Sequence, residues 1–446
     1  MESTVKLSDV LDGGKLSRFQ YGIFALCALA VFVEGFDTQA IGYVAPVLSK
    51  AWALRPGALG PVFAAGLFGL LCGSLLIAPL ADRFGRRTII LWSTFSFGVL
   101  TLVTPLADSL SSLLVIRFLT GLGLGGAMAN AIALCAEYAP ERRRISIVGI
   151  MFCGFALGSA FGGLIAASLL SSHGWQAVFF AGGVLTLVLL PLFWAFLPES
   201  VRFLALRGTD ERQVARILAR IDHRFDEVVA VHLLTEETRT LGITVRYLFR
   251  DGRGAVTMLL WVIFFMGLLD LYWLAFWLPT TINAMGIAVD LAVIATALMQ
   301  IGGIAGALIL GPAVDRFGPF VVLPLAYLLA AACIVGIGYG GGSVLVTMVT
   351  VFGAGFGIVG SQNCNNGFAA KSYPTAIRST GVGWANAIGR SGSIVGPTIG
   401  GILLTHGMEI RNIFIASAAP ALCACTAYLT MGWWVRRARL GHDRLW

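Results

Sequence analysis

The four residues Asp82-Arg83-Phe84-Gly85 recur as Asp315-Arg316-Phe317-Gly318, 233 positions further along a chain of 446 residues. At the same offset, Asp37 corresponds to Asp270. With one more residue in the offset, a longer set is repeated: Gly121, Gly123, Gly126, Pro140, Arg144 and Gly149 fall on Gly355, Gly357, Gly360, Pro374, Arg378 and Gly383. Chance could give one such pair but not the whole register, so the chain contains two related halves.

The composition indicates that the solvent of this chain is a lipid bilayer. Hydrophobic residues make up 57% of the sequence and charged residues 12%, and the mean hydropathy is +0.85. A soluble domain usually carries about a quarter charged residues, so this chain could not cover its surface in water. Many of the 55 glycines lie inside apolar runs, where small residues let helices in lipid approach closely.

The apolar runs predict twelve transmembrane helices, each near the ~20 residues that span the hydrocarbon. They cover residues 20–48, 58–80, 89–107, 110–136, 145–171, 176–197, 255–283, 290–312, 320–338, 343–369, 381–407 and 411–435. The expected fold is therefore an all-α membrane protein with two pseudo-symmetric six-helix bundles. The expected domains are an N-terminal bundle (1–197), a polar linker (198–254) and a C-terminal bundle with a tail (255–446). Within the linker, Thr209 to Leu234 predicts one or two short amphipathic helices on the membrane surface.

The formal net charge of +8 is mostly a topology signal, and it does not indicate nucleic-acid binding. The basic residues gather in alternate short loops: Arg83, Arg86, Arg87, Arg142, Arg143, Arg144, Arg316, Lys371 and Arg378, against Lys50, Arg55 and Arg411 in the other set. By the positive-inside rule, both termini and the linker are expected in the cytoplasm, with the protein in the inner membrane. The first apolar run is too long for a cleavable signal peptide.

Two related halves with parallel topology are typical of carriers that bind substrate near the midplane, between halves that rock about it. Neither a Walker lysine motif nor Cys and His residues at metal-ligand spacing are found in the sequence. We therefore expect no metal and no cofactor, and an ion gradient as the driving force. Because one chain contains the complete two-half unit, a monomer is expected to suffice.

Five ionisable residues lie well inside predicted helices: Glu34, Asp37, Asp270, Arg117 and Arg390. An unpaired charge at the bilayer centre costs several kcal/mol, so each needs a partner or a function. Glu34 and Asp37 are three residues apart on one helix face, where repulsion favours a proton on one of them. Arg390 is suited to a substrate carboxylate, because a guanidinium binds it through two parallel hydrogen bonds. Arg117 could simply brace its own half.

The loop Ala78-Pro-Leu-Ala-Asp82-Arg83-Phe-Gly85-Arg86-Arg87 resembles the signature of the major facilitator superfamily between helices 2 and 3, with Ala78 where Gly is usual. The stretches 117–121 (Arg-Phe-Leu-Thr-Gly) and 198–204 (Pro-Glu-Ser-Val-Arg-Phe-Leu) resemble further motifs of that superfamily. Within it, Glu34-Gly-Phe-Asp37-Thr-Gln resembles the acidic signature of the aromatic acid:proton symporters, as does the segment from Tyr373-Pro374-Thr375 to Arg390. That family takes up compounds such as 4-hydroxybenzoate, protocatechuate and 3-(3-hydroxyphenyl)propionate.

The resemblance implies a proton-coupled importer of aromatic carboxylates, not an enzyme, with Glu34 and Asp37 as the proton-coupling pair. The expected substrate-binding residues are Arg390, Asp270, Trp273, Trp277, Gln362, Asn363, Asn366 and Asn130. Asp82, Arg83, Gly85, Arg86, Arg87, Asp315 and Arg316 are expected to act as a conformational latch, with Arg117 and Glu137 in structural or coupling roles. The expected partners are an aromatic carboxylate, protons and the lipid bilayer.

Two other interpretations stay open at this point. A carrier of the same superfamily could take another organic acid, a sugar or a drug. An intramembrane aspartyl protease could use Asp37 and Asp270 as a carboxylate dyad. Their contexts, Glu-Gly-Phe-Asp and Gly-Leu-Leu-Asp, lack the Gly-x-Gly-Asp loop of such proteases, so the protease interpretation is the weaker one.

Overall fold

The computed structural model describes residues 2–5, 16–207, 211–222, 230–233, 245–250, 253–340, 343–373 and 377–440. The long helices are α2 (Arg18–Ala51), α3 (Gly60–Leu76), α5 (Arg86–Val103), α6 (Leu110–Tyr138), α7 (Arg144–Phe196), α10 (Gly254–Ala284), α11 (Val289–Phe317), α12 (Pro319–Tyr339), α13 (Val344–Lys371), α14 (Arg378–Thr405) and α15 (Ile410–Leu440). Short elements at the ends of these helices are η1 (Ala78–Leu80), α4 (Ala81–Phe84), η2 (Thr104–Leu106) and η3 (Glu141–Arg143).

The described helices give the twelve predicted transmembrane spans. Ten candidate spans are long and apolar enough to cross a membrane. One of them lies in α7, where Gly174 has φ 76° and ψ 179°, a break that divides the 53-residue helix into two spans. Helix α14 has 28 residues and is the twelfth. The fold prediction is therefore confirmed, although the two predicted helices 145–171 and 176–197 run on from one another without a loop.

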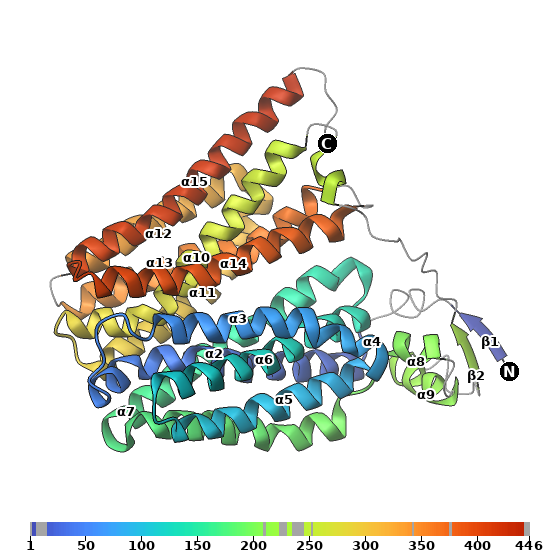
Figure 1. Ribbon diagram of the computed structural model, residues 1–446. Helices are drawn as coiled ribbons and strands as arrows, with labels where there is room; N and C mark the ends of the chain where they lie inside the picture. Colours follow the sequence, from blue (N-terminus) through green and yellow to red (C-terminus); the bar gives the residue numbers. More distant parts are fainter. Residues whose placement is uncertain are drawn as a thin grey trace.

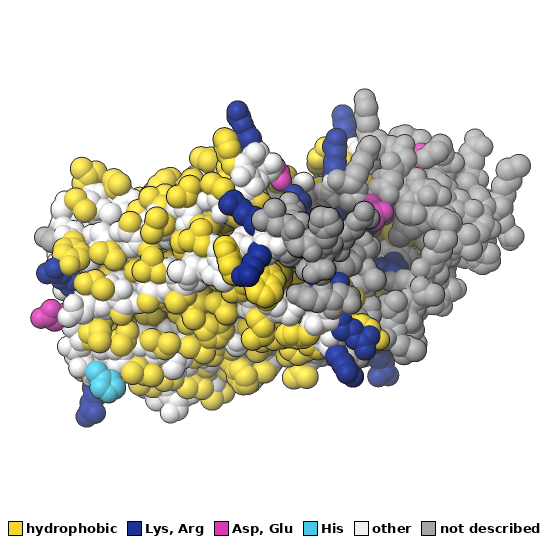
Figure 2. Space-filling model, turned by 90° about the horizontal axis from the view of Figure 1, so that it is seen from above, with side chains coloured by type: hydrophobic (Ala, Val, Ile, Leu, Met, Phe, Trp, Pro, Cys, Tyr) yellow, Lys and Arg dark blue, Asp and Glu magenta, His cyan; other side chains and the backbone are white. Residues whose placement is uncertain are grey.

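Helices α2, α3, α5, α6 and α7 form one bundle, and α10 to α15 form the other. In Figure 1 the two bundles lie together at one end and diverge towards the end that bears α4, α8 and α9. Contacts between bundles are made by α7 with α11, α3 with α14 and α2 with α10. Hydrophobic side chains cover broad areas of the face in Figure 2, and large ones such as Trp92 and Leu345 are exposed. Such a surface fits lipid and not water.

The repeated glycines explain why the two bundles pack alike. A Cβ at Gly121 of α6 would collide with the carbonyl oxygen of Gly66 of α3. At the repeat position, a Cβ at Gly355 of α13 would collide with the carbonyl oxygen of Met299 of α11. In both bundles, therefore, the backbones of two helices touch at a crossing that only glycine allows.

The linker and the N-terminal segment add smaller elements at one end of the molecule. These are α8 (Val201–Arg207), α9 (Glu211–Ile221), η5 (Val245–Phe249), and strands β1 (Glu2–Val5) and β2 (Ala230–Leu233). Helix α9 buries Val214 and Leu218 in the core of the N-terminal bundle, in line with the predicted amphipathic helix. The strands form a short parallel pair that the sequence did not predict. The rest of the predicted 209–234 segment lies outside the described residues, as does Pro374-Thr375.

Candidate functional site

Helix α2 brings Glu34 and Asp37 into the interior of the N-terminal bundle. Ser17 starts this helix with a capping box, in which its side chain accepts from the backbone of Gln20. Both Glu34 and Asp37 are 1% exposed. Although they are only three positions apart, their surroundings differ, and only one of the two carboxylates has a partner among the described residues.

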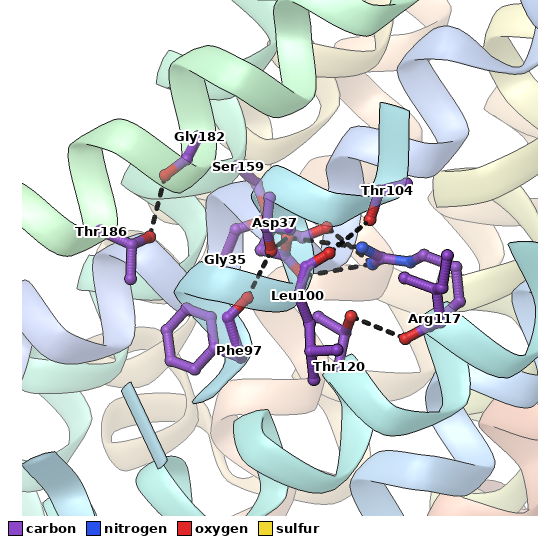
Figure 3. A network of polar contacts seen from close by, with 12 residues as sticks. Gly35, Asp37, Phe97, Leu100, Thr104, Arg117, Thr120, Ser159, Gly182 and Thr186 are labelled. Carbon is purple, nitrogen blue, oxygen red and sulfur yellow. Dashed lines mark hydrogen bonds and ion pairs between the residues drawn. The ribbon is translucent and has the colours of Figure 1, made fainter. Parts of the chain in front are cut away.

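Asp37 is the paired carboxylate of α2 (Figure 3). Arg117 of α6 approaches it with Nη2 3.2 Å from Oδ2, and the same nitrogen donates to the Asp37 carbonyl at 3.0 Å. Thr101 of α5 donates to Oδ1 at 2.5 Å. The guanidinium of Arg117 also lies 5.8 Å from the centre of the Phe179 ring. These contacts join α2, α5, α6 and α7 in a buried ion pair within one bundle.

Glu34 is the carboxylate of α2 for which the described residues provide no hydrogen-bond partner. Neither of its side-chain oxygens is reached by a hydrogen bond from the described residues. The guanidinium of Arg390, on α14 of the other bundle, is close enough for its charge to act on Glu34. Arg390 Nη2 lies 3.3 Å from the sulfur of Met128 on α6, and a thioether is a weak acceptor. A buried acid and a partly buried guanidinium thus interact through their charges across the bundle boundary.

The bundles close together at the end of the molecule that includes the 52–59 segment and the end of α14. Gln39 of α2 donates to the carbonyl of Ala275 on α10, and Thr405 donates to the carbonyl of Pro56 at 3.0 Å. Phe63 of α3 stacks on Phe276 of α10, with ring centres 4.9 Å apart. Beside this closure a small cavity is lined by residues of both bundles: Thr38, Ile41, Val62, Phe63, Gly66, Leu67, Leu70, Arg117, Leu124 and Phe276.

Trp273 and Trp277 lie on α10 at the same closed end. Both are buried, at 2% exposure. Trp277 donates to the carbonyl of Pro397 at 2.8 Å and lies edge-on to Phe63, with ring centres 5.0 Å apart. Trp273 lies edge-on to Phe414 of α15 at 5.9 Å. The two indoles therefore belong to the packing between α10, α14 and the neighbouring helices at the closed end.

Asp270 lies one turn before Trp273 on α10. It is 1% exposed, and neither carboxylate oxygen is hydrogen-bonded to a described residue. A Cβ on Gly267, one turn before Asp270, would lie 2.9 Å from the hydroxyl oxygen of Tyr327 on α12. Tyr327 accepts from Asn365 at 3.0 Å, and Tyr428 donates to the amide oxygen of the same Asn365 at 2.7 Å. A polar cluster of α12, α13 and α15 thus lies beside this carboxylate.

Helix α13 carries a run of amide side chains at positions 362, 363, 365 and 366, here called the polar run, and these amides point to different places. Gln362 accepts from Asn365 at 3.1 Å and so belongs to the polar cluster. Asn363 and Asn366 are exposed side chains, and Asn366 accepts from Asn386 of α14 at 3.1 Å. Asn130 of α6, by contrast, is buried and donates to carbonyls of Gly126 and Ala78. Its amide therefore ties α6 to η1, the short element that follows α3.

The loop after α3 is built around a carboxylate at the start of α5. Gly85 has φ 94°, and a Cβ on it would lie 2.7 Å from Cδ of Glu199. The side chain of Glu199 accepts from the backbone N–H of Arg87 at 3.1 Å, and the Arg87 guanidinium donates to the carbonyl of Trp194. A carboxylate at a helix N-terminus is stabilised by the unpaired N–H groups there.

The remaining latch residues include one partly buried and one exposed ion pair. Arg86 Nη2 is 2.6 Å from Glu137 Oε1, and Ser200 donates to the other Glu137 oxygen at 2.5 Å. In the second half, Lys371 is 3.1 Å from Asp315, with side chains 76% and 70% exposed. Asp82, Arg83 and Arg316 are exposed, and the two arginines lie over the adjacent rings of Phe84 and Phe317.

Several residues at these sites were not singled out from the sequence. Thr101, Met128, Tyr327 and Tyr428 gave no signal, because single polar or soft side chains in apolar helices are common packing residues. Glu199 did give one, since it stands in the Pro-Glu-Ser stretch at the end of a span. A carboxylate beside a loop of positive charge could have been expected to bind that loop.

Two six-helix bundles that hold buried, incompletely paired ionisable groups at membrane depth define a multi-pass membrane carrier. The sequence model of the Major Facilitator Superfamily matches residues 27–397, and the chain belongs to this superfamily. It is accordingly a membrane transporter and not an enzyme.

Named relatives and solved structures resemble the chain over nearly its whole length. A gallate transporter of Pseudomonas putida is 40% identical over 97% of this chain and 96% of its own. A 4-hydroxybenzoate transporter of Pseudomonas aeruginosa is 40% identical over 95% and 94%. The 3-(3-hydroxy-phenyl)propionate transporter of Escherichia coli is 34% identical over 93% and 94%. The inward-open xylose transporter of E. coli has the same fold, with a TM-score of 0.69, 17% identity and coverage of 92% and 95%.

Proposed function

We propose that this protein imports an aromatic monocarboxylate together with protons across the cytoplasmic membrane by alternating access. The observation that carries the proposal is that Glu34 and Arg390 interact through their charges across the bundle boundary, while among the described residues Glu34 has no hydrogen-bond partner and Arg390 contacts the Met128 thioether. Gallate, 4-hydroxybenzoate and 3-(3-hydroxyphenyl)propionate, the compounds in the names of the relatives, are all aromatic acids. They support this substrate class.

Arg390 binds the carboxylate of the substrate in this mechanism. A guanidinium offers two parallel donors to a carboxylate, which are far stronger than its contact with the Met128 sulfur. A protonated Glu34 leaves Arg390 free for the substrate. A deprotonated Glu34 attracts Arg390 and competes with the substrate carboxylate. Proton release from Glu34 therefore favours release of the substrate, which couples the two fluxes.

Asp37 contributes to coupling through its ion pair with Arg117, which fixes α2 against α5 and α6 and so sets the position of Glu34. The aromatic ring of the substrate lies against Trp273 and Trp277 in this proposal. Aromatic pairs of suitable geometry gain about 0.5–1.5 kcal/mol beyond the burial of area. Amides of the polar run and of α6 are proposed to bond ring hydroxyls: Gln362, Asn363, Asn366 and Asn130.

Alternating access requires that the closed end opens while the other end closes. The latch residues Asp82, Arg83, Gly85, Arg86, Arg87, Asp315 and Arg316, with Glu137, are proposed to act at the end that now diverges. By the positive-inside rule this end and both termini face the cytoplasm. The two moving units are residues 1–197 and 255–446, joined by the linker 198–254. A monomer, driven by the proton gradient without a cofactor, is sufficient.

Uptake of radiolabelled gallate, 4-hydroxybenzoate and 3-(3-hydroxyphenyl)propionate by cells that express the protein tests the proposal. We expect saturable uptake that a protonophore abolishes. The Arg390→Lys variant loses one charge-assisted hydrogen bond, worth about 1.5–3 kcal/mol, so its apparent affinity should fall about 10- to 100-fold. Arg411→Lys is the matched control, because Arg411 lies over the Tyr339 ring outside the site.

Three outcomes would count against the proposal in different ways. Uptake that survives the protonophore would contradict proton coupling. Unchanged affinity in Arg390→Lys would remove Arg390 from the site. No uptake of any of the three acids, by protein present in the membrane, would overturn the substrate class.

A further inference from the structure

Asp270 is a buried carboxylate for which the proposed coupling through Glu34 has no need. It lies in the middle of α10, a membrane-spanning helix, and no described residue hydrogen-bonds to either oxygen. An ionised carboxylate without a partner costs several kcal/mol in such a place. In this conformation, therefore, the neutral, proton-bearing form of Asp270 is the favoured one.

The repeat shows what Asp270 lacks. Its counterpart Asp37 is held by Thr101 and Arg117. At the corresponding positions the second half has Ile334 and Val351, both fully buried aliphatic residues. A carboxylate with a fixed cation stays ionised throughout a transport cycle, whereas one among aliphatic side chains can gain and lose a proton as its surroundings change.

The surroundings of Asp270 contain groups that can exchange a proton but no described cation bonded to it. The Tyr327 hydroxyl lies against Gly267, one turn before Asp270, and Asn365 links Tyr327 to Tyr428. The helices packed on α10 carry further ionisable residues. Those deep in the helices include Cys364 on α13, Glu34, Asp37 and Tyr43 on α2, and Arg390 on α14, and those near helix ends include Asp290, Asp315 and Arg316 on α11, Lys50 on α2, Lys371 on α13 and Arg411 on α15. Asp37 contacts Arg117 and Arg390 contacts Met128, so the contacts described above for these two residues do not involve Asp270.

Helix α10 also takes part in the closure that alternating access must open. Ala275 accepts from Gln39 of the other bundle, and Phe276 stacks on Phe63. Both lie within two turns of Asp270. The helix that carries Asp270 therefore takes part in the contacts that must separate during alternating access.

We propose that Asp270 is a second proton-binding site of the carrier, so that two protons accompany each aromatic anion. This role differs from the substrate-binding role expected for Asp270 from the sequence, and it rests on the proposed function. The number of protons decides the net charge that each transport cycle moves. One monoanion with one proton moves no net charge, whereas one monoanion with two protons moves one positive charge inward and is drawn by an inside-negative potential.

Steady-state accumulation in proteoliposomes counts the protons. With the full-length protein and no pH gradient, two protons predict a tenfold higher accumulation ratio for each 59 mV of inside-negative potential. At zero potential, two protons predict an accumulation ratio about 100-fold higher for each unit of pH gradient, since each transported proton contributes a factor of ten. For Asp270→Asn we expect an accumulation ratio that does not respond to the potential and that rises about tenfold for each unit of pH gradient.

A measurement without transport tests the bound proton itself. The infrared carbonyl band of a protonated carboxylic acid should weaken in purified Asp270→Asn relative to the unmodified protein at neutral pH. Asp108→Asn is the matched control. Asp108 is exposed, and hydrogen bonds from Ser112 and Ser109 hold its pKa below the usual value, so it is ionised and its removal leaves the band unchanged.

The outcomes separate this inference from the proposed function. No band difference in Asp270→Asn would overturn the inference even if uptake is normal. A band difference with unaltered accumulation slopes would show that the proton is bound but not transported, and would overturn it also. Uptake that is independent of the potential in the unmodified protein would limit the carrier to one proton. Absence of uptake would overturn the proposed function, and the proton count with it.

Discussion

The two halves of this transporter derive from one repeat but treat buried charge in opposite ways. Each half has one arginine deep in the membrane. In the first half, Arg117 is bonded to Asp37 of the same bundle, and in the second half Arg390 reaches out to Met128 of the other bundle. The repeat counterparts of these arginines are Val351 and Ala156, so neither half keeps the charge of the other.

The comparison teaches that a buried ionisable side chain paired within its own bundle is not available to bind a substrate or a transported proton. A buried ion pair fixes helices in one arrangement, because breaking it leaves an uncompensated charge. Arg390, Glu34 and Asp270 have no such partner among the described residues, and they are therefore free to respond to a ligand or a proton. The first half serves as the rigid frame, and the ionisable groups available for coupling lie at the boundary and in the second half.

The largest effect that this comparison predicts is on stability. Arg117→Met leaves Asp37 buried without compensation, which should lower the free energy of unfolding by about 3–5 kcal/mol. Arg390→Met removes an arginine that has no carboxylate bonded to it, so the change should stay within about 1 kcal/mol. Denaturant unfolding of the two purified variants in the same detergent measures the difference. The double variant Asp37→Asn/Arg117→Met should recover most of the loss.

Equal losses in Arg117→Met and Arg390→Met would break the comparison, since Arg390 would then have a stabilising partner of its own. Failure of the double variant to recover would show that the aliphatic stem and the Phe179 contact of Arg117 matter more than its charge.

The class of fold could be predicted from the sequence because it depends on two properties that survive in one dimension. Hydropathy gives the spans, and the repeated glycines give the symmetric helix crossings. The five ionisable residues inside the spans could also be found, since charge at membrane depth is rare. The division of α7 was also predicted, since the gap between the predicted helices 145–171 and 176–197 contains Gly174, where the helix breaks. The sequence did not show that the chain continues helically on both sides of Gly174 without a loop.

The partners of the buried charges could not be predicted. Spacing places Glu34 and Asp37 on one face of α2, but a carboxylate is paired or unpaired according to what neighbouring helices bring to it. Thr101 comes from α5 and Arg117 from α6, and their approach depends on tertiary packing. The same holds for Asn130, whose amide is bonded to backbone carbonyls.

The two copies of the repeated loop give the next prediction. Gly85 and Gly318 have nearly the same backbone, with φ 94° and 85°, so alanine should cost about 1–3 kcal/mol at either position. A Cβ at Gly85 also meets Glu199, whereas at Gly318 it meets open space. Gly85→Ala should therefore lower stability and the rate of uptake further than Gly318→Ala does. Thermal unfolding and initial uptake rates of the pair measure this, and equal effects would show that Glu199 does not hold the loop.

The smallest expected difference concerns the ion pairs of the two loops. Glu137 is bonded to Arg86 with side chains only 13% and 23% exposed, so Glu137→Gln should cost about 1.5–3 kcal/mol, as for a hydrogen bond to a charged group. Asp315 and Lys371 are largely in solvent, and Asp315→Asn should cost about 0–1 kcal/mol. Raising the salt concentration sharpens the test, because screening acts on exposed pairs much more than on buried ones. Unfolding of the unmodified protein and both variants at low and high salt should therefore show the Asp315 effect vanish and the Glu137 effect persist. The reverse pattern would place the tight latch in the second half.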